Sequence, residues 1–148
     1  MHNFAQNPGE PINTFILPFV FTDKVTQAVK SLWQCHSPLE HRLILIDNSG
    51  EDFADRQYLE ENSHLYIRSY RNLGPAMAFN LGIKIAKTEY ISIISDDARL
   101  VTCDWFSQAV DKLVKEKKRQ NFTENYHPLM LSANSIYPQK VPAEQFYQ

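Results

Sequence analysis

The sequence lacks several features that assign a chain to a familiar class. It has four glycines among 148 residues, and neither GxGxxG nor GxxxxGK[ST] occurs, which argues against a Rossmann dinucleotide site and against a P-loop. No apolar run approaches the roughly 20 residues that a membrane-spanning helix needs. The formal net charge is -2, so we expect no nucleic acid as a partner.

Cysteine is also scarce. Cys35 and Cys103 form no CxxC pair, and no set of His and Cys residues has the spacing of a zinc site. We therefore expect two free thiols in a reducing cytoplasm. The first residues contain no basic segment followed by an apolar core, so residues 1–12 are predicted to be a flexible lead-in and not a signal peptide.

What the sequence does contain is a regular alternation of apolar segments. Strands are expected at residues 14–17, 42–46, 64–68, 90–94 and 129–133. Apolar residues recur at helical spacing at about residues 23–33, 53–61, 75–86 and 104–114. This alternation predicts an α/β fold over residues 13–148, with a mostly parallel sheet and helices on both faces. Pro18 is expected to stop the first strand, and Thr22 or Asp23 to cap the helix after it.

Polar clusters come directly after three of these expected strands, at residues 18–23, 47–49 and 95–97. In a parallel sheet all three lie on the same edge, which is where α/β proteins bind ligands. The sequence therefore predicts a binding crevice that several strand ends build together.

The third cluster contains two adjacent acids, Asp96 and Asp97. Two carboxylates can hold a divalent cation, which usually takes its remaining ligands from substrate phosphates and water. Because neighbouring carboxylates repel each other, a bound cation would relieve a real cost. The alternative, a solvated loop or the cap of the next helix, stays open.

Four other positions can be interpreted either as part of a binding site or as ordinary structural features. Asp47 can accept hydrogen bonds from a nucleobase or a ribose, but Asp-Asn-Ser-Gly is also a common turn. Asn72 and Gly74 precede a helix start, where the backbone can approach an anion, or they form an ordinary strand-to-helix turn. Asn80 either faces the crevice or lies in solvent.

Four stretches in this order resemble family 2 glycosyltransferases, in the nucleotide-sugar-binding half of their GT-A fold. They are FILP at 15–18, LIDNS at 45–49, NLGPAMAFNLGI at 72–83, and YISIISDDARL at 90–100 with DW at 104–105. The resemblance covers about residues 14–133.

The resemblance implies an enzyme that binds a UDP-, GDP- or dTDP-linked sugar with Mn²⁺ or Mg²⁺. Such an enzyme transfers the sugar to a glycan or another hydroxyl acceptor with inversion, as in polysaccharide biosynthesis. It is cytoplasmic or peripheral at the inner face of the membrane. The resemblance implies that Asp97 and Asp96 bind the metal, in what looks like a DxD motif. The residues it implies for donor nucleotide binding are Pro18, Phe19, Asp47, Asn72, Gly74, Asn80 and Asp96.

The chain also departs from the family pattern. Ser95 stands where the family often has its first Asp, Phe21 where an Asn is common, and Phe79 where an Arg is common. Family members continue into an acceptor-binding half with the catalytic base, and neither Asp104 nor Glu144 matches that base. One alternative is therefore a truncated, catalytically silent module that binds a nucleotide or a protein. Another is that a homodimer or a partner chain completes the site.

Overall fold

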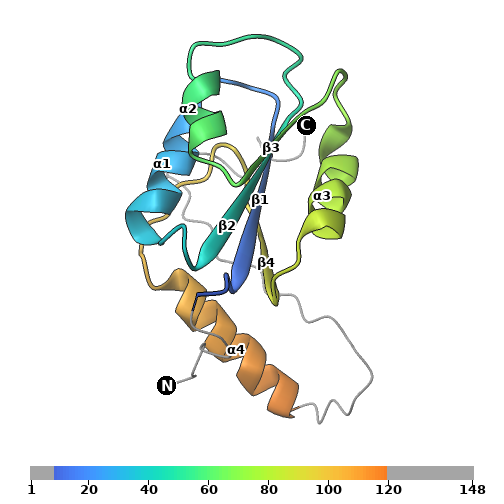
Figure 1. Ribbon diagram of the computed structural model, residues 1–148. Helices are drawn as coiled ribbons and strands as arrows, with labels where there is room; N and C mark the ends of the chain where they lie inside the picture. Colours follow the sequence, from blue (N-terminus) through green and yellow to red (C-terminus); the bar gives the residue numbers. More distant parts are fainter. Residues whose placement is uncertain (1–8, 120–148) are drawn as a thin grey trace, which may run out of the picture. The chain divides into compact units, whose positions relative to one another are not determined.

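The computed structural model describes residues 9–119. The chain divides into two compact units, Met1–Cys103 and Asp104–Gln148, which we describe separately. In the first unit a parallel sheet of four strands has the order β3-β2-β1-β4 and lies between helices (Figure 1). The strand expected at residues 129–133 lies outside the described residues.

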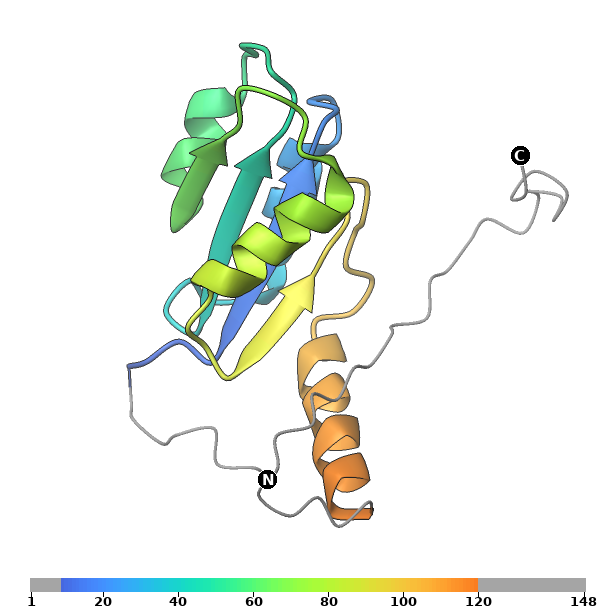
Figure 2. The ribbon, with the colours of Figure 1, turned by 90° about the vertical axis from the view of Figure 1, so that its right-hand side faces the viewer.

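The order of the helices and strands agrees with the prediction. The strands are β1 (Asn13–Phe19), β2 (His41–Asp47), β3 (Leu65–Arg68) and β4 (Tyr90–Ile93). The helices of the first unit are α1 (Val25–Cys35), α2 (Arg56–Glu61) and α3 (Gly74–Ile85). α1 and α2 cover one face of the sheet and α3 covers the other (Figures 1 and 2).

β1 is longer than predicted, because Pro18 lies within the strand and does not end it. The backbone groups of β1 alternate between its two neighbours. The Ile94 N–H donates to the Ile16 carbonyl on the β4 side, and the Asn48 N–H donates to the Phe19 carbonyl on the β2 side. Pro18 therefore faces the β4 side, where pairing has already ended at Ile16. Its missing N–H breaks no ladder, which is why the strand tolerates it.

The core is built from residues that alternate along β1. Phe15, Leu17 and Phe19 are buried on the face that α1 and α2 cover. Ile16 is buried on the other face, against α3. α3 approaches closely because Gly82 has no side chain, and a Cβ at this position would overlap the Ile16 side chain. Each fully buried Leu, Ile or Phe contributes about 1.5–3 kcal/mol.

The start of α1 differs from the prediction. Neither Thr22 nor Asp23 caps α1, because the helix begins after Lys24 and no side chain accepts a hydrogen bond from its first turn. Its stability comes instead from a buried apolar face, as is usual for helices in proteins. Pro75 lies in the first turn of α3, where its missing N–H costs no helical hydrogen bond.

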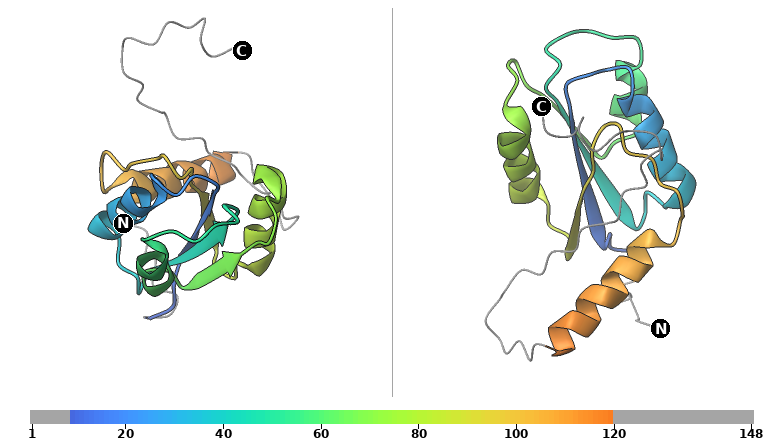
Figure 3. Two further views of the ribbon diagram at one scale, coloured as in Figure 1. Left: turned by 90° about the horizontal axis from the view of Figure 1, so that it is seen from above. Right: turned by 180° about the vertical axis from the view of Figure 1, so that it is seen from behind.

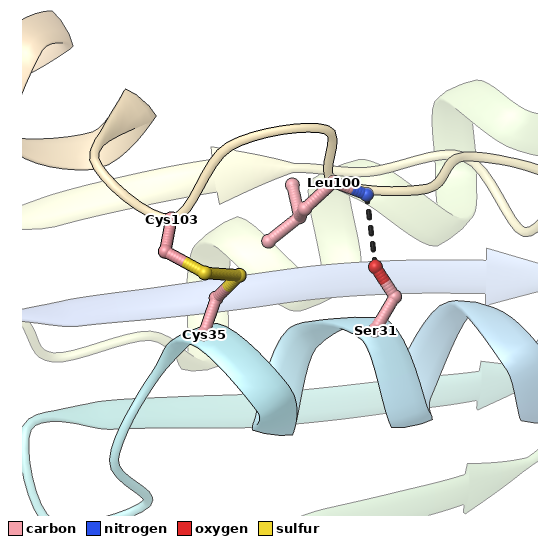
Figure 4. The surroundings of a disulfide bond; sticks show 4 residues. All are labelled: Ser31, Cys35, Leu100 and Cys103. Atoms are coloured by element: carbon pink, nitrogen blue, oxygen red, sulfur yellow. Dashed lines mark hydrogen bonds between the residues drawn. A yellow bond between two sulfur atoms is a disulfide. The ribbon is translucent and has the colours of Figure 1, made fainter.

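The prediction of two free thiols was wrong, because Cys35 and Cys103 form a disulfide. Their Cα atoms are 4.8 Å apart, although 68 positions separate them in the sequence. Cys35 is the last residue of α1, and the segment after β4 brings Cys103 beside it (Figure 4). The pairing therefore depends on a chain path that the spacing of two cysteines does not reveal.

The described part of the second unit is α4 (Trp105–Arg119). The residue before it, Asp104, accepts a hydrogen bond at its carboxylate from the Gln108 side-chain amide at 2.6 Å. The last turn of α4 is basic. Among residues 9–119, no helix is long and apolar enough to cross a membrane.

Candidate functional site

The carboxyl ends of the strands meet at one edge of the sheet, since all four strands run in the same direction (Figure 2). The pairing places Phe19 opposite Asp47 and Asp47 opposite Arg68, so β1, β2 and β3 end side by side. β4 ends earlier, with Ile93 opposite Ile16. The three predicted polar clusters lie at these ends or just beyond them, and we call this the carboxyl edge.

Asp47 is fully buried at the centre of the carboxyl edge, with 0% of its surface exposed. Its Oδ1 accepts hydrogen bonds from the Ser49 N–H at 2.9 Å and the Ser49 hydroxyl at 2.6 Å. Its Oδ2 accepts a hydrogen bond from the Tyr66 hydroxyl at 2.6 Å. These three short hydrogen bonds hold both oxygens of the Asp47 side chain inside the fold.

Tyr66 was missed by the sequence reasoning. Burial, and then the hydrogen bond to Asp47, raise the pKa of Tyr66 above its ordinary value. The phenol is therefore a neutral donor that holds the Asp47 carboxylate. Tyr66 pairs with Leu45, two residues before Asp47, which puts the two polar side chains on the same face. Their proximity depends on this register, which the sequence alone did not give.

Phe19 and Pro18, both predicted to bind the donor, have different surroundings. The Phe19 side chain is 2% exposed and packs edge-to-face against the rings of Phe53 and Tyr66. It therefore belongs to the core, and only the half-buried Pro18 and the loop after it face outward. In that loop the Phe21 side chain is 71% exposed.

Asn72 and Gly74 form the start of α3. The Gly74 N–H donates to Asn72 Oδ1 at 2.8 Å, and Gly74 has a φ of +73°, which few other residues adopt without strain. The Leu73 N–H points to Oδ1 of the buried Asn48 at 3.5 Å, which ties this start to the end of β2. The positive end of the helix dipole lies here and favours anions. Asn80 is exposed further along α3.

Residues 95–98 form a turn that carries both acids, which we call the acid turn. The Ala98 N–H closes it by donating to the Ser95 carbonyl at 3.0 Å. Ser95 Oγ donates to Asp97 Oδ1 at 2.6 Å and lies 3.4 Å from Asp96 Oδ1. Asp97 is exposed and Asp96 is half-buried. The Ser95 hydroxyl thus orients the acids beside it.

The electrostatic surroundings of the acid turn favour an ionised Asp97. The hydrogen bond from Ser95 is the main cause that lowers the pKa of Asp97, and the charges of Lys24 and Arg99 act in the same direction. The Arg99 guanidinium also donates to the carbonyl of Ala98 at 2.8 Å. The acid turn is therefore anionic at neutral pH and lies beside two cations.

The donor set of the acid turn fits a hard divalent cation. Carboxylate oxygens are the side-chain ligands that Mg²⁺ and related ions prefer. Within residues 9–119 no group of three or more His, Cys, Asp or Glu side chains gathers to hold a metal. A cation at Asp96 and Asp97 must therefore take further ligands from elsewhere, as Mg²⁺ does from substrate phosphates and water.

Comparison with known protein families agrees with this arrangement. The family model "Glycosyl transferase family 2" matches residues 18–133, which include the carboxyl edge and the acid turn. The chain belongs to this family. Enzymes of the family are generally dependent on divalent metals.

The fold is the GT-A fold, which solved structures share. The crystal structure of S. aureus TarS is 15% identical and has a TM-score of 0.57, and it aligns with 70% of this chain and 20% of its own. The structure of S. aureus TarS 1-349 is 14% identical with a TM-score of 0.53, aligned over 70% of this chain and 32% of its own. The chain thus spans a fifth to a third of these neighbours. No curated protein matches it.

Proposed function

We propose that the carboxyl edge binds a nucleoside diphosphate sugar together with Mn²⁺ or Mg²⁺. The observation that carries this proposal is the acid turn, where two adjacent acids lie just beyond a strand end of a family 2 chain. A protein that contains this unit would transfer the sugar to a hydroxyl acceptor, such as a glycan, with inversion.

Asp97 and Asp96 would hold the cation, in the manner of a DxD motif whose first acid is replaced by Ser95. When bound, the cation supplies Lewis-acid stabilisation of the charge on a departing nucleoside diphosphate. Ser95 contributes by fixing the direction of the Asp97 carboxylate. The lowered pKa keeps that carboxylate ionised and ready to bind.

The start of α3 is the second element of the proposed donor site. Gly74 carries no side chain and a Cβ there would meet open space, so a ligand can approach the backbone. Asn72 holds the turn that leads into the helix. Together with the helix dipole, this geometry suits the phosphates of a donor.

Asp47 is proposed to recognise the base or the ribose, on one structural condition. Its carboxylate is fully buried and its Oδ2 accepts the Tyr66 hydrogen bond, so a direct contact of Oδ2 with a nucleoside requires this bond to open. Until then Asp47 shapes the 47–49 turn through Ser49. Pro18 and the loop after it flank the same position.

The test is calorimetric titration of the whole chain with UDP, GDP and dTDP, with and without Mn²⁺. We expect one nucleotide to bind only with Mn²⁺, and Asp97→Ala to abolish that binding. The matched control is Glu89→Gln, which alters an exposed acid just before the other end of β4. If a folded chain binds no nucleotide, the donor site is wrong and a silent interaction module becomes the better hypothesis. If Asp97→Ala binds normally, only the metal assignment is wrong.

A further inference from the structure

The segment immediately after the acids, residues 98–103, contains no helix or strand. We call it the strap. It runs along α1 from the acid turn toward the end of that helix (Figures 3 and 4). Because the strap continues directly from Asp97, its attachment limits how far the acid turn can move.

Two hydrogen bonds attach the strap to α1. The Arg99 guanidinium donates to the Lys24 carbonyl at 3.0 Å, just before the helix begins. The Leu100 N–H donates to Ser31 Oγ at 2.8 Å, about two turns further on. Both bonds involve a side chain, and no strand pairing supports them within residues 98–103.

The third attachment is the Cys35–Cys103 disulfide, which is covalent. Three residues span at most about 10 Å, so a bonded Cys103 keeps Leu100 close to α1. Without the disulfide, no covalent cross-link holds the strap against α1, and the hydrogen bonds to Ser31 and from Arg99 remain. The disulfide therefore decides how firmly the strap is attached.

Arg99 links the strap to the acid turn. Besides its bond to Lys24, the guanidinium donates to the Ala98 carbonyl at 2.8 Å and lies 3.5 Å from the Asp96 carbonyl. The planar group thus joins the backbone that carries the acids to the start of α1. Movement of the strap would pull on this group and shift the acids.

We propose that the strap positions Asp96 and Asp97 for the cation and that the redox state of Cys35 and Cys103 sets the strength of cation binding. The inference rests on the proposed function, since the cation is the one assigned there. In the oxidised chain the acids are held together at one place. In the reduced chain the strap loosens and the acids bind the cation more weakly. Arg99 is a positioning residue in this scheme.

The chemistry of the switch is ordinary thiol–disulfide exchange. Cys103 is exposed and Cys35 is half-buried, so a reductant can reach the bond. A dithiol supplies two electrons and two protons, the S–S bond breaks, two thiols form, and the dithiol closes into its own disulfide. No atom of the acid turn changes, so an altered affinity reports its position.

The first measurement is hydrogen exchange of the whole chain without metal. The oxidised chain is compared with a chain reduced by dithiothreitol and then desalted anaerobically, because residual thiols would bind Mn²⁺. We expect the amides of the acid turn and the strap to exchange faster after reduction, whereas Cys35→Ser/Cys103→Ser shows fast exchange whether or not it is treated. Equal exchange in the two redox states would overturn the inference.

The second measurement is titration of the same samples with Mn²⁺ alone, monitored by the electron paramagnetic resonance signal of the free ion. We expect reduction to raise the Kd at least about fivefold, the low end of coupling between two sites. Cys35→Ser/Cys103→Ser should bind Mn²⁺ with the higher Kd of the reduced chain, and reductant should not change that Kd. An unchanged Kd overturns this inference alone. If no form binds Mn²⁺ alone, the inference fails, whereas the proposed function is decided by the calorimetric titration with nucleotide and Mn²⁺.

A substitution distinguishes the positioning role of the Arg99 side chain from the effect of its charge. Arg99→Lys keeps the charge but loses the planar fork of donors. We expect Arg99→Lys to raise the Kd for Mn²⁺ in the oxidised chain, again by about fivefold. The control is Arg42→Lys, at an exposed position near the amino ends of the strands, which should leave the Kd unchanged. Normal affinity in Arg99→Lys would show that Arg99 acts by charge alone, which overturns its assignment as a positioning residue.

Discussion

Two strand ends at the carboxyl edge carry acids and are built in opposite ways. At the end of β2, Asp47 is fully buried, and its two oxygens accept hydrogen bonds from Ser49 and Tyr66. After β4, Asp97 is exposed and Asp96 is half-buried. An acid whose oxygens are occupied serves the fold first, whereas exposed acids retain lone pairs for a ligand.

The difference arises from the positions of the two strands in the sheet. β2 is paired on both sides as far as Asp47 itself, with Phe19 and Arg68 as its partners. Among the described residues β4 pairs only with β1, and this pairing ends at Ile93. Beyond the bond from the Ile94 N–H to the Ile16 carbonyl, no strand pairing holds the described residues after β4, and side chains and the strap contribute to their attachment. The comparison therefore predicts that changes at the end of β2 cost stability and that changes after β4 cost binding.

The largest expected effect comes from cutting the attachment of the strap. In the chain-entropy model, a disulfide across 68 positions contributes about 4 kcal/mol by restricting the unfolded chain. We expect Cys35→Ser/Cys103→Ser to lower the free energy of unfolding by about this amount. Urea denaturation measures it, from the unfolding transition of the first unit. Reductant should shift the original chain equally and leave the variant unchanged. A loss below about 1 kcal/mol would contradict this account of the unfolded chain.

The second expected effect concerns the other edge of the sheet, where His41 lies 3% exposed at the start of β2. The Asn13 amide donates to His41 Nδ1 at 3.2 Å, since Asn13 Oδ1 already accepts from the Ser92 hydroxyl. Burial, and then the charge of the neighbouring His36, lower the pKa of His41 to about 4. The folded chain therefore holds this imidazole neutral.

Acid should destabilise the fold through this histidine. The unfolded chain protonates His41 near the ordinary histidine pKa of 6.5, and the folded chain near 4. Stability is thus full above pH 6.5, falls as the pH drops toward 4, and loses about 3 kcal/mol in total. Urea denaturation from pH 7.5 to 4 measures this slope. His41→Asn should flatten it, and an equal slope in that variant would assign the effect to His36 or His64.

A smaller effect is expected from the contact that locks Asp47. Tyr66→Phe removes the donor to Asp47 Oδ2 and leaves the aromatic ring in place. A hydrogen bond to a charged group contributes about 1.5–3 kcal/mol, so we expect a loss of about 2 kcal/mol. Tyr58→Phe is the matched control. The Lys30 ammonium lies over the Tyr58 ring, 5.3 Å from its centroid, and this contact needs no hydroxyl. If the two variants are equally stable, the Tyr66 hydroxyl does not stabilise the fold through Asp47. The contrast between a structural acid after β2 and exposed acids after β4 would then lack support.

The comparison also shows what the sequence could and could not predict. Apolar periodicity placed the helices and strands, because the burial of one face depends only on local spacing. Pro18 was misjudged because its missing N–H matters only on the side where a partner strand pairs. Whether a proline interrupts a sheet depends on the length of the neighbouring strand, which its own sequence does not contain.

The candidate site was predictable to a similar degree. The acids and the turn at Asn72 could be recognised as motifs, because their residues are adjacent in the chain. Tyr66 could not, since its contact with Asp47 depends on the register of β3. The disulfide could not either, since Cys103 reaches Cys35 only by the path of the strap. Motifs report the groups that meet a ligand, whereas long-range contacts decide how those groups are held.

The smallest expected effect on stability belongs to the residue with the largest expected effect on binding. Asp97 is exposed, and its main partner is the Ser95 hydroxyl, which can turn to water. We expect Asp97→Ala to change the free energy of unfolding by no more than about 0.5 kcal/mol, as at most surface positions. Removal of one of two adjacent negative charges also relieves repulsion. Urea denaturation without metal measures this value beside the calorimetric titration with Mn²⁺ and nucleotide. A variant that lost both stability and binding would place Asp97 in the same class as Asp47, and the distinction between a locked acid and an available one would fail.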